Sequence, residues 1–238
     1  MPQTGDVHQS DRVIGVDGCR GGWLGAVVED GQRVEWLLLP YAAAVFALEA
    51  VVIGIDMPIG LPDQGRRDCD WAARKRLGPA QNAVFLTPVR GVLEGRVLDG
   101  WDYPAVNELS RRLTGFGLSK QTWNILDRIG DVDAALGDAP DPRVVEVHPE
   151  VSFRVLDDRV VAGKKTAVGV GQRIRALAGW IDVGGALAEV PLGPGLDDAL
   201  DALVAAWSAR NWLRGNAVVL PGDDPPRDGR GRPMRIVA

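Results

Sequence analysis

Two apolar segments of the sequence each end on a carboxylate. The first, VIGVD at residues 13–17, ends on Asp17, and the second, VVIGID at residues 51–56, ends on Asp56. Continuous apolar runs of this length are typical of strands buried on both faces of a sheet. A charge at the end of such a strand either turns the chain, as Asp17-Gly18 would do in a hairpin, or binds a cation.

Further acids lie in the most regular helical pattern of the chain. Residues 196–215 are apolar on nearly every helical face, which is typical of a helix buried against a sheet. Asp201 lies inside this pattern, where an ionised carboxylate needs a partner or a metal ion. Asp198 comes three residues earlier and shares its face. Capping of the helix is an alternative role for Asp197 and Asp198, but it leaves Asp201 unexplained.

Carboxylates that converge without a basic partner repel one another unless hard cations neutralise them. Carboxylate oxygens are the ligands that Mg²⁺ and Mn²⁺ prefer. Two such ions, roughly 3.5–4 Å apart, activate water and stabilise the leaving oxygen in phosphodiester cleavage. The sequence therefore predicts a two-metal nuclease whose catalytic and metal-binding residues include Asp17, Asp56, Asp198 and Asp201.

The segment EVHPE supplies a further candidate ligand, either Glu146 or Glu150. Glu146 is favoured because it lies within the strand expected at residues 143–150. His148 shares the strand face of Glu146, and both a site role and local hydrogen bonding at a strand end fit it.

The elements that must position these acids follow a recognisable order. Strands at 13–18, 22–28 and 33–40 form an antiparallel meander, with its second turn at Asp30-Gly31. A short helix leads to the strand at 51–56, which is expected to pair in parallel with the first strand through a right-handed crossover. This is the order of an α/β ribonuclease H-like core.

The remaining segments are assigned to one domain and a tail. We expect residues 64–137 to form a mainly helical insertion rather than a separate domain, because no flexible linker flanks them. The single domain is expected to span residues 13–215. Residues 216–238 are rich in Pro, Gly and Asp, and are expected to be mostly irregular with a short strand at MRIV.

Basic residues gather in the insertion although the net charge of the chain is −5. Arginines beside a carboxylate site are suited to bind phosphates. We therefore expect Arg66, Arg74 and Lys120 to contact a nucleic-acid substrate, DNA or RNA. The alternatives are a solvated charged face and ion pairs of Asp70 with the arginines four residues to either side.

The composition and the cysteine spacing indicate a globular protein without a structural zinc site. The chain has 238 residues, of which 46% are hydrophobic and 25% charged, as in ordinary globular proteins. Its two cysteines, Cys19 and Cys69, lack the spacing of a structural zinc site and fit a reducing compartment. No long apolar run or leader pattern occurs, so a cytoplasmic protein without membrane contact is expected. The oligomeric state stays open.

Several sequence motifs occur in the order in which they occur in one protein family. The chain resembles an uncharacterised prokaryotic family, a domain of unknown function described as a predicted ribonuclease H-like nuclease, through GVDGCRGGW, IDMPIGLP, RRDCDWAAR, VFLTPVR, GLSKQ, EVHPEVSF and DDALDAL. Asp198 and Asp201 are also similar to the last-helix motif of Holliday-junction resolvases. The fourth strand of those enzymes supplies a glutamate where this chain has Asp56.

Two other functions remain compatible with these motifs. GVDGCRGG also resembles a phosphate-binding hairpin of actin-like phosphotransferases. Those proteins bind nucleotides between two such domains, whereas the sequence pattern indicates one core domain. A binding module that uses the fold without catalysis is the second alternative. It would bind without any dependence on metal.

Overall fold

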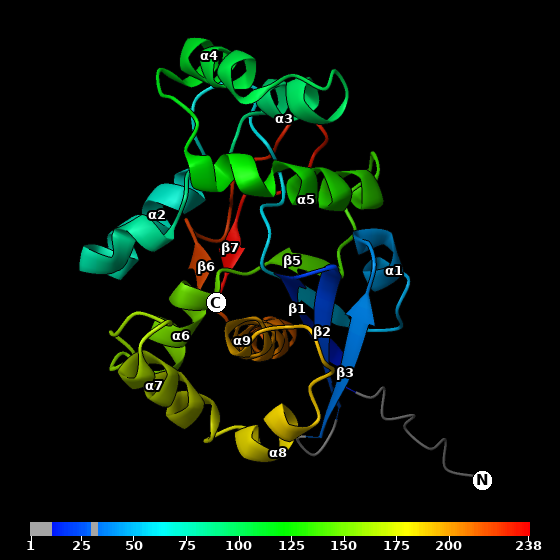
Figure 1. Ribbon diagram of the computed structural model, residues 1–238, viewed down its shortest axis with the longest axis vertical. Helices are drawn as coiled ribbons and strands as arrows, with labels where there is room; N and C mark the ends of the chain where they lie inside the picture. The colour runs from blue at the N-terminus through cyan, green and yellow to red at the C-terminus, as the bar shows by residue number, and fades with distance from the viewer. Residues whose placement is uncertain (1–10, 30–32) are drawn as a thin grey trace, which may run out of the picture.

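The computed structural model describes residues 11–29 and 33–238, which form a sheet covered by helices on both faces (Figure 1). The sheet is five-stranded with the order β3-β2-β1-β4-β5. Its strands are β1 Val13–Cys19, β2 Gly22–Val28, β3 Val34–Leu39, β4 Val52–Ile55 and β5 Val144–Glu146. The first three are antiparallel, and β4 and β5 continue the sheet in parallel. This confirms the expected α/β class and is consistent with a ribonuclease H-like core.

The first hairpin turns later than Asp17-Gly18. In the β1–β2 ladder Asp17 pairs with Leu24 and Gly18 with Trp23, so both residues continue the strand. The interpretation of Asp17-Gly18 as the turn is therefore wrong. The second predicted turn, at Asp30-Gly31, lies outside the described residues.

One face of the sheet is covered by helices that precede β5. They are α1 Ala42–Phe46, α3 Arg90–Val97, α4 Tyr103–Thr114 and α5 Lys120–Leu136. Helix α2 Asp68–Leu77, followed by the 3-10 turn η1 at Gly78–Ala83, packs instead with Val151, Met234 and Ile236 in a separate apolar cluster. The segment expected to be a helical insertion is therefore built from α2 to α5. Ile14 and Ile53 point to this side and pack with Leu126 of α5. In Figure 1, α3 and α4 lie beyond α5, farther from the sheet.

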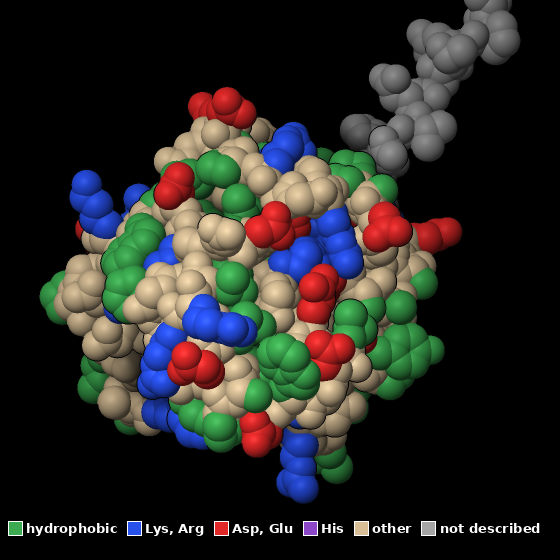
Figure 2. Space-filling view, turned by 90° about the horizontal axis from the view of Figure 1, so that it is seen from above, with side chains coloured by type: hydrophobic (Ala, Val, Ile, Leu, Met, Phe, Trp, Pro, Cys, Tyr) green, Lys and Arg blue, Asp and Glu red, His purple; other side chains and the backbone are tan. Residues whose placement is uncertain are grey.

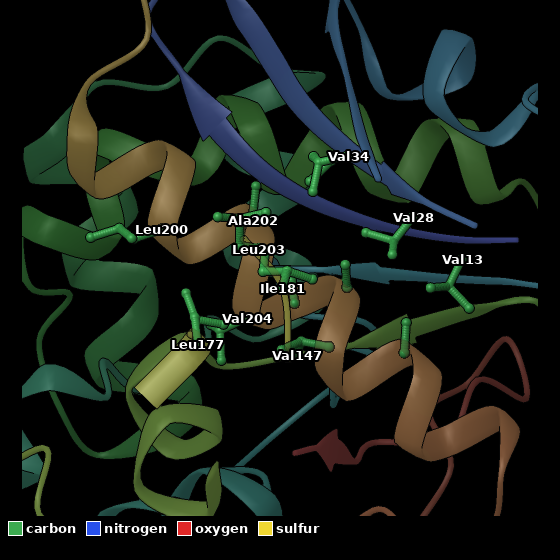
Figure 3. Packing of buried hydrophobic residues seen from close by; sticks show 14 of the residues in the cluster. Val13, Val28, Val34, Val147, Leu177, Ile181, Leu200, Ala202, Leu203 and Val204 are labelled. Carbon is green, nitrogen blue, oxygen red and sulfur yellow. The ribbon is translucent and has the colours of Figure 1, made fainter. Parts of the chain in front are cut away.

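The opposite face is covered by α9, Leu196–Leu213, together with α6 Pro149–Leu156, α7 Ala167–Leu177 and α8 Val183–Ala188. Figure 3 shows Leu203 of α9 close to Ile181. These side chains belong to one buried apolar cluster. The near-uniform apolarity of α9 follows from this position, because the sheet and the outer helices surround it.

Two expectations for the end of the chain are corrected. The strand expected at 143–150 ends at Glu146, and α6 begins at Pro149, a residue suited to the first helical position. The tail carries a short antiparallel pair, β6 Val219–Leu220 and β7 Ile236–Val237, and so includes the strand expected near MRIV. A bridge between Val147 and Val237 attaches β7 to the main sheet. The tail is thus packed into the fold although much of it is irregular.

Candidate functional site

Two glycines in register let α9 lie directly on the sheet. Gly15 of β1 pairs with Gly54 of β4. A Cβ atom at Gly15 would overlap the backbone of Ala202 and Ala206, and one at Gly54 would lie 2.7 Å from the carbonyl oxygen of Ala205. No side chain fits at either position, so the glycine pair sets the distance between α9 and the two strands.

The same packing brings the predicted acids to one end of the sheet. Asp17 and Asp56 each come two residues after one of the glycines, so both lie on the face that carries α9. The N–H of Asp56 donates to the carbonyl oxygen of Val16 at 2.9 Å, which continues the parallel register up to the acids. Helix α9 carries Asp198 and Asp201 about one turn before its contacts with the glycines. We call Asp17, Asp56, Asp198 and Asp201 the carboxylate cluster.

Burial and mutual repulsion change the ionisation of three of these acids. Burial, and then the charges of Asp56 and Asp201, raises the pKa of Asp17 well above its usual value. Burial and the charge of Asp201 raise the pKa of Asp56 to about 8. Burial also raises the pKa of Asp201 to about 6, against the opposing effect of Lys164. Ionising the cluster at neutral pH is therefore costly unless cations are present.

A lysine lies among these acids, contrary to the expectation that they lack a basic partner. Lys164, in the loop between α6 and α7, donates a hydrogen bond to Oδ2 of Asp201 at 2.6 Å. Burial opposes its charge, but the carboxylates of Asp201, Asp17 and Asp56 outweigh this effect and raise the pKa of Lys164. The sequence signal is weak, because Lys164 is one of two adjacent lysines and stands 37 residues from Asp201. One cation of the site thus comes from the chain itself.

Asp198 has a structural contact in addition to its place in the cluster. Its Oδ2 accepts a hydrogen bond from the N–H of Gly195, the residue before α9, at 2.8 Å. The capping role considered for Asp198 is therefore present, while its charge also acts on Asp17. Across residues 11–29 and 33–238, no three Asp, Glu, His or Cys side chains are placed to hold one metal ion. Metal binding by the cluster would therefore require its side chains to move closer together.

The predicted ligand Glu146 lies in a buried ion-pair network instead. Its carboxylate accepts hydrogen bonds from Nη1 and Nη2 of Arg67 at 2.6 and 2.7 Å and from the N–H of Ile59 at 2.7 Å. Arg67 also binds Asp70 at 2.5 Å. The structure thus gives Glu146 a role in joining β5 to the start of α2, outside the carboxylate cluster.

The other two candidates of the EVHPE segment are Glu150 and His148, and the charge of Glu146 acts on Asp56 as well. The two carboxylate oxygens of Glu150 accept hydrogen bonds from Nη2 of Arg173 at 2.8 and 2.7 Å. The charge of Glu150 still contributes to the raised pKa of Asp56. His148 lines a small cleft together with Asp56, and burial lowers its pKa. Both glutamates considered as ligands are therefore engaged by arginines.

Two of the three predicted phosphate-binding residues line one cavity. Arg66 and Arg74 face a cavity of about 190 Å³ between α2, α4 and the start of α5. Lys120 does not line it; its Nζ lies 3.2 Å from the centroid of the Tyr103 ring. The alternative of helical ion pairs is wrong, because the carboxylate of Asp70 binds a different arginine.

No helix of the described residues is both long and apolar enough to cross a membrane. No curated protein and no solved structure matches the chain. A family model described as "Protein of unknown function (DUF429)" matches residues 15–226, a span that includes the carboxylate cluster and Lys164. The chain therefore belongs to the DUF429 family of proteins of unknown function.

Proposed function

We propose that the protein is a metal-dependent nuclease that hydrolyses phosphodiester bonds of DNA or RNA. One observation carries the proposal: the parallel pairing of β1 and β4 ends just before Asp17 and Asp56, on the face where a glycine pair admits a helix that bears Asp201. Two buried acids, Asp17 and Asp201, beside the partly buried Asp56 are costly to maintain for stability alone. Such a cost is typical of functional sites.

The chemistry of the donors fits Mg²⁺ or Mn²⁺. The cluster offers only carboxylate oxygens, which hard divalent cations prefer. Their pKa values are raised mainly by burial and by one another, so a bound cation would relieve the repulsion. When bound, two such ions supply an activated water and stabilise the leaving oxygen of a phosphodiester.

In this proposal the residues of the chain have distinct tasks. Asp17 and Asp56 hold ions from the rigid strand ends, and Asp201 completes the site from α9. Asp198 keeps the first turn of α9 in place through its hydrogen bond to Gly195. Lys164 neutralises Asp201, and an ion bound beside Asp201 would compete with this contact.

The test is a cleavage assay on single- and double-stranded DNA and RNA with Mg²⁺, Mn²⁺ or EDTA. We expect cleavage that requires metal and that falls by at least about 100-fold in Asp56→Asn, since even outer-shell partners of a metal contribute about 10–100-fold. Asp138→Asn, which neutralises an exposed acid, serves as the matched control and should keep full activity. Absence of cleavage by the parent, or equal rates for Asp56→Asn and the parent, contradicts the proposal.

A further inference from the structure

The cavity that contains Arg66 and Arg74 has the features of an anion site. Its walls come from the segment before α2, from residues 82–88, from α4 and from the first turn of α5. Its volume of about 190 Å³ corresponds to roughly six water molecules at liquid density. The size suits a phosphate group with part of its hydration shell better than a whole nucleotide.

Aromatic rings and backbone oxygens hold the two guanidinium groups in place. Arg66 lies 3.9 Å from the ring centroid of Phe116, and Trp71 lies under both arginines at 5.9 and 5.8 Å. Nη1 of Arg74 donates to the carbonyl oxygen of Val84 at 2.8 Å. Within the part of the chain that the structure describes, neither arginine forms an ion pair with a carboxylate. The cavity thus holds two positive charges that no carboxylate pairs with directly, although the charge of Asp70 acts on Arg66.

A buried hydroxyl group gives an independent indication of a ligand. Thr87 lines the cavity and is only 5% exposed. Among the described residues its Oγ1 has no hydrogen-bond partner, which is uncommon for a buried polar atom. Its N–H donates to Oδ2 of Asp70 at 2.9 Å, which holds the residue in position. Ser119, the residue that caps α5, lines the same cavity, so the positive end of a 17-residue helix is also present.

We propose that this cavity binds the terminal phosphate of a nucleic-acid strand, an inference that rests on the proposed nuclease function. A terminal phosphate carries a charge of about −1.5 to −2 at pH 7, whereas each internal phosphodiester carries a single negative charge. Two guanidinium groups and a helix N-terminus match the higher charge. The face seen in Figure 2 carries Lys and Arg side chains interspersed with Asp and Glu, which is unlike the continuous basic stripe of a protein that follows a nucleic-acid backbone.

The cavity also shares a wall with the candidate active site. Val84, Phe85 and Thr87 line both the cavity and the small cleft that contains Asp56. Asp56 is the member of the carboxylate cluster that lines this cleft, so a strand end bound by the arginines would approach the cluster from the side of Asp56. The protein would act close to phosphorylated ends.

The experiment measures binding in EDTA, so that no cleavage takes place. Short DNA and RNA oligonucleotides are compared with a 5′-phosphate, a 3′-phosphate or hydroxyl groups at both ends. We expect the parent to prefer one phosphorylated form by at least about tenfold, the contribution of one charge-assisted hydrogen bond. The preference should disappear in Arg66→Gln and weaken in Thr87→Val, which keeps the side-chain shape. Arg76→Gln removes an exposed charge from α2, the helix that carries Arg74, and should retain the preference.

Three outcomes overturn the inference: no preference by the parent, an unchanged preference in both cavity variants, or an equal loss in Arg76→Gln. Inorganic phosphate is titrated in parallel. If the cavity residues bind it while the phosphorylated oligonucleotides show no preference, the site holds a small free phosphate and the inference fails. Asp56→Asn should keep the end preference, so loss of cleavage and loss of end binding are separately observable.

Discussion

Replacing Asp56 by asparagine should make the stability of the metal-free protein less dependent on pH. The pKa of Asp56 is about 8 in the folded protein and about 4 in an unfolded chain. Between these values the folded state holds a proton that the unfolded state has released. The free energy of unfolding therefore falls as the pH rises through this window, and Asp56 adds no slope below or above it.

The size of the effect follows from the proton count. One group in this situation contributes up to about 1.4 kcal/mol per pH unit. Asp56→Asn removes that contribution and also one of the charges that act on Asp17. From pH 5 to pH 8 the parent should lose about 1 kcal/mol per pH unit more than the variant. At pH 8 the variant should be the more stable protein by about 1–3 kcal/mol.

The assay is urea unfolding at pH 5, 6, 7 and 8 in the presence of EDTA, with stability obtained by linear extrapolation. Asp138→Asn, the exposed control, should follow the parent at every pH. Parallel profiles for Asp56→Asn and the parent would refute the reasoning. So would a variant that is less stable than the parent at pH 8.

Three further changes test the packing and the ion pairs. Gly15→Ala should destabilise the protein by about 1–3 kcal/mol or more because α9 must shift. A Cβ atom at Gly25 would have its nearest neighbour at 3.7 Å, so Gly25→Ala should cost within about 1 kcal/mol. Thermal unfolding distinguishes the two variants. Arg67→Met leaves two buried carboxylates without their partner and should cost about 3–5 kcal/mol in urea unfolding, and a neutral result would contradict the buried network. Lys164→Met should destabilise the metal-free protein at pH 8 by about 1–2 kcal/mol, a value reduced from that of a fully buried ion pair because the lysine side chain is 36% exposed. The same variant should bind Mn²⁺ more tightly in calorimetry. Lys165→Met should change neither stability nor Mn²⁺ binding.

The sequence predicted the part of the fold that depends on local pattern. The apolar runs ending on Asp17 and Asp56 are strands, and their parallel pairing is confirmed. The uniformly apolar segment around Asp201 is a buried helix, as its pattern indicates. These elements can be recognised in the sequence because a strand buried on both faces, or a helix buried on all sides, contains few polar residues.

The contacts that decide the ionisation of the site were not visible in the sequence. Lys164 reaches Asp201 from a loop whose course depends on tertiary packing. Arg67 reaches Glu146 across 79 residues, and no spacing rule connects them. Position within a strand favours Glu146 as a ligand, but it does not reveal which cation lies opposite the side chain.

Calorimetric titration of Mn²⁺ into the metal-free protein at pH 7.5 tests the central claim, that the carboxylate cluster binds divalent cations. We expect binding by the parent, loss of binding in the Asp17→Asn, Asp56→Asn double variant, and full binding by Asp138→Asn. At about 100 times the dissociation constant, the ion should stabilise the parent by roughly 2.7 kcal/mol per site. No binding by the parent, or equal binding by the parent and the double variant, would contradict the account.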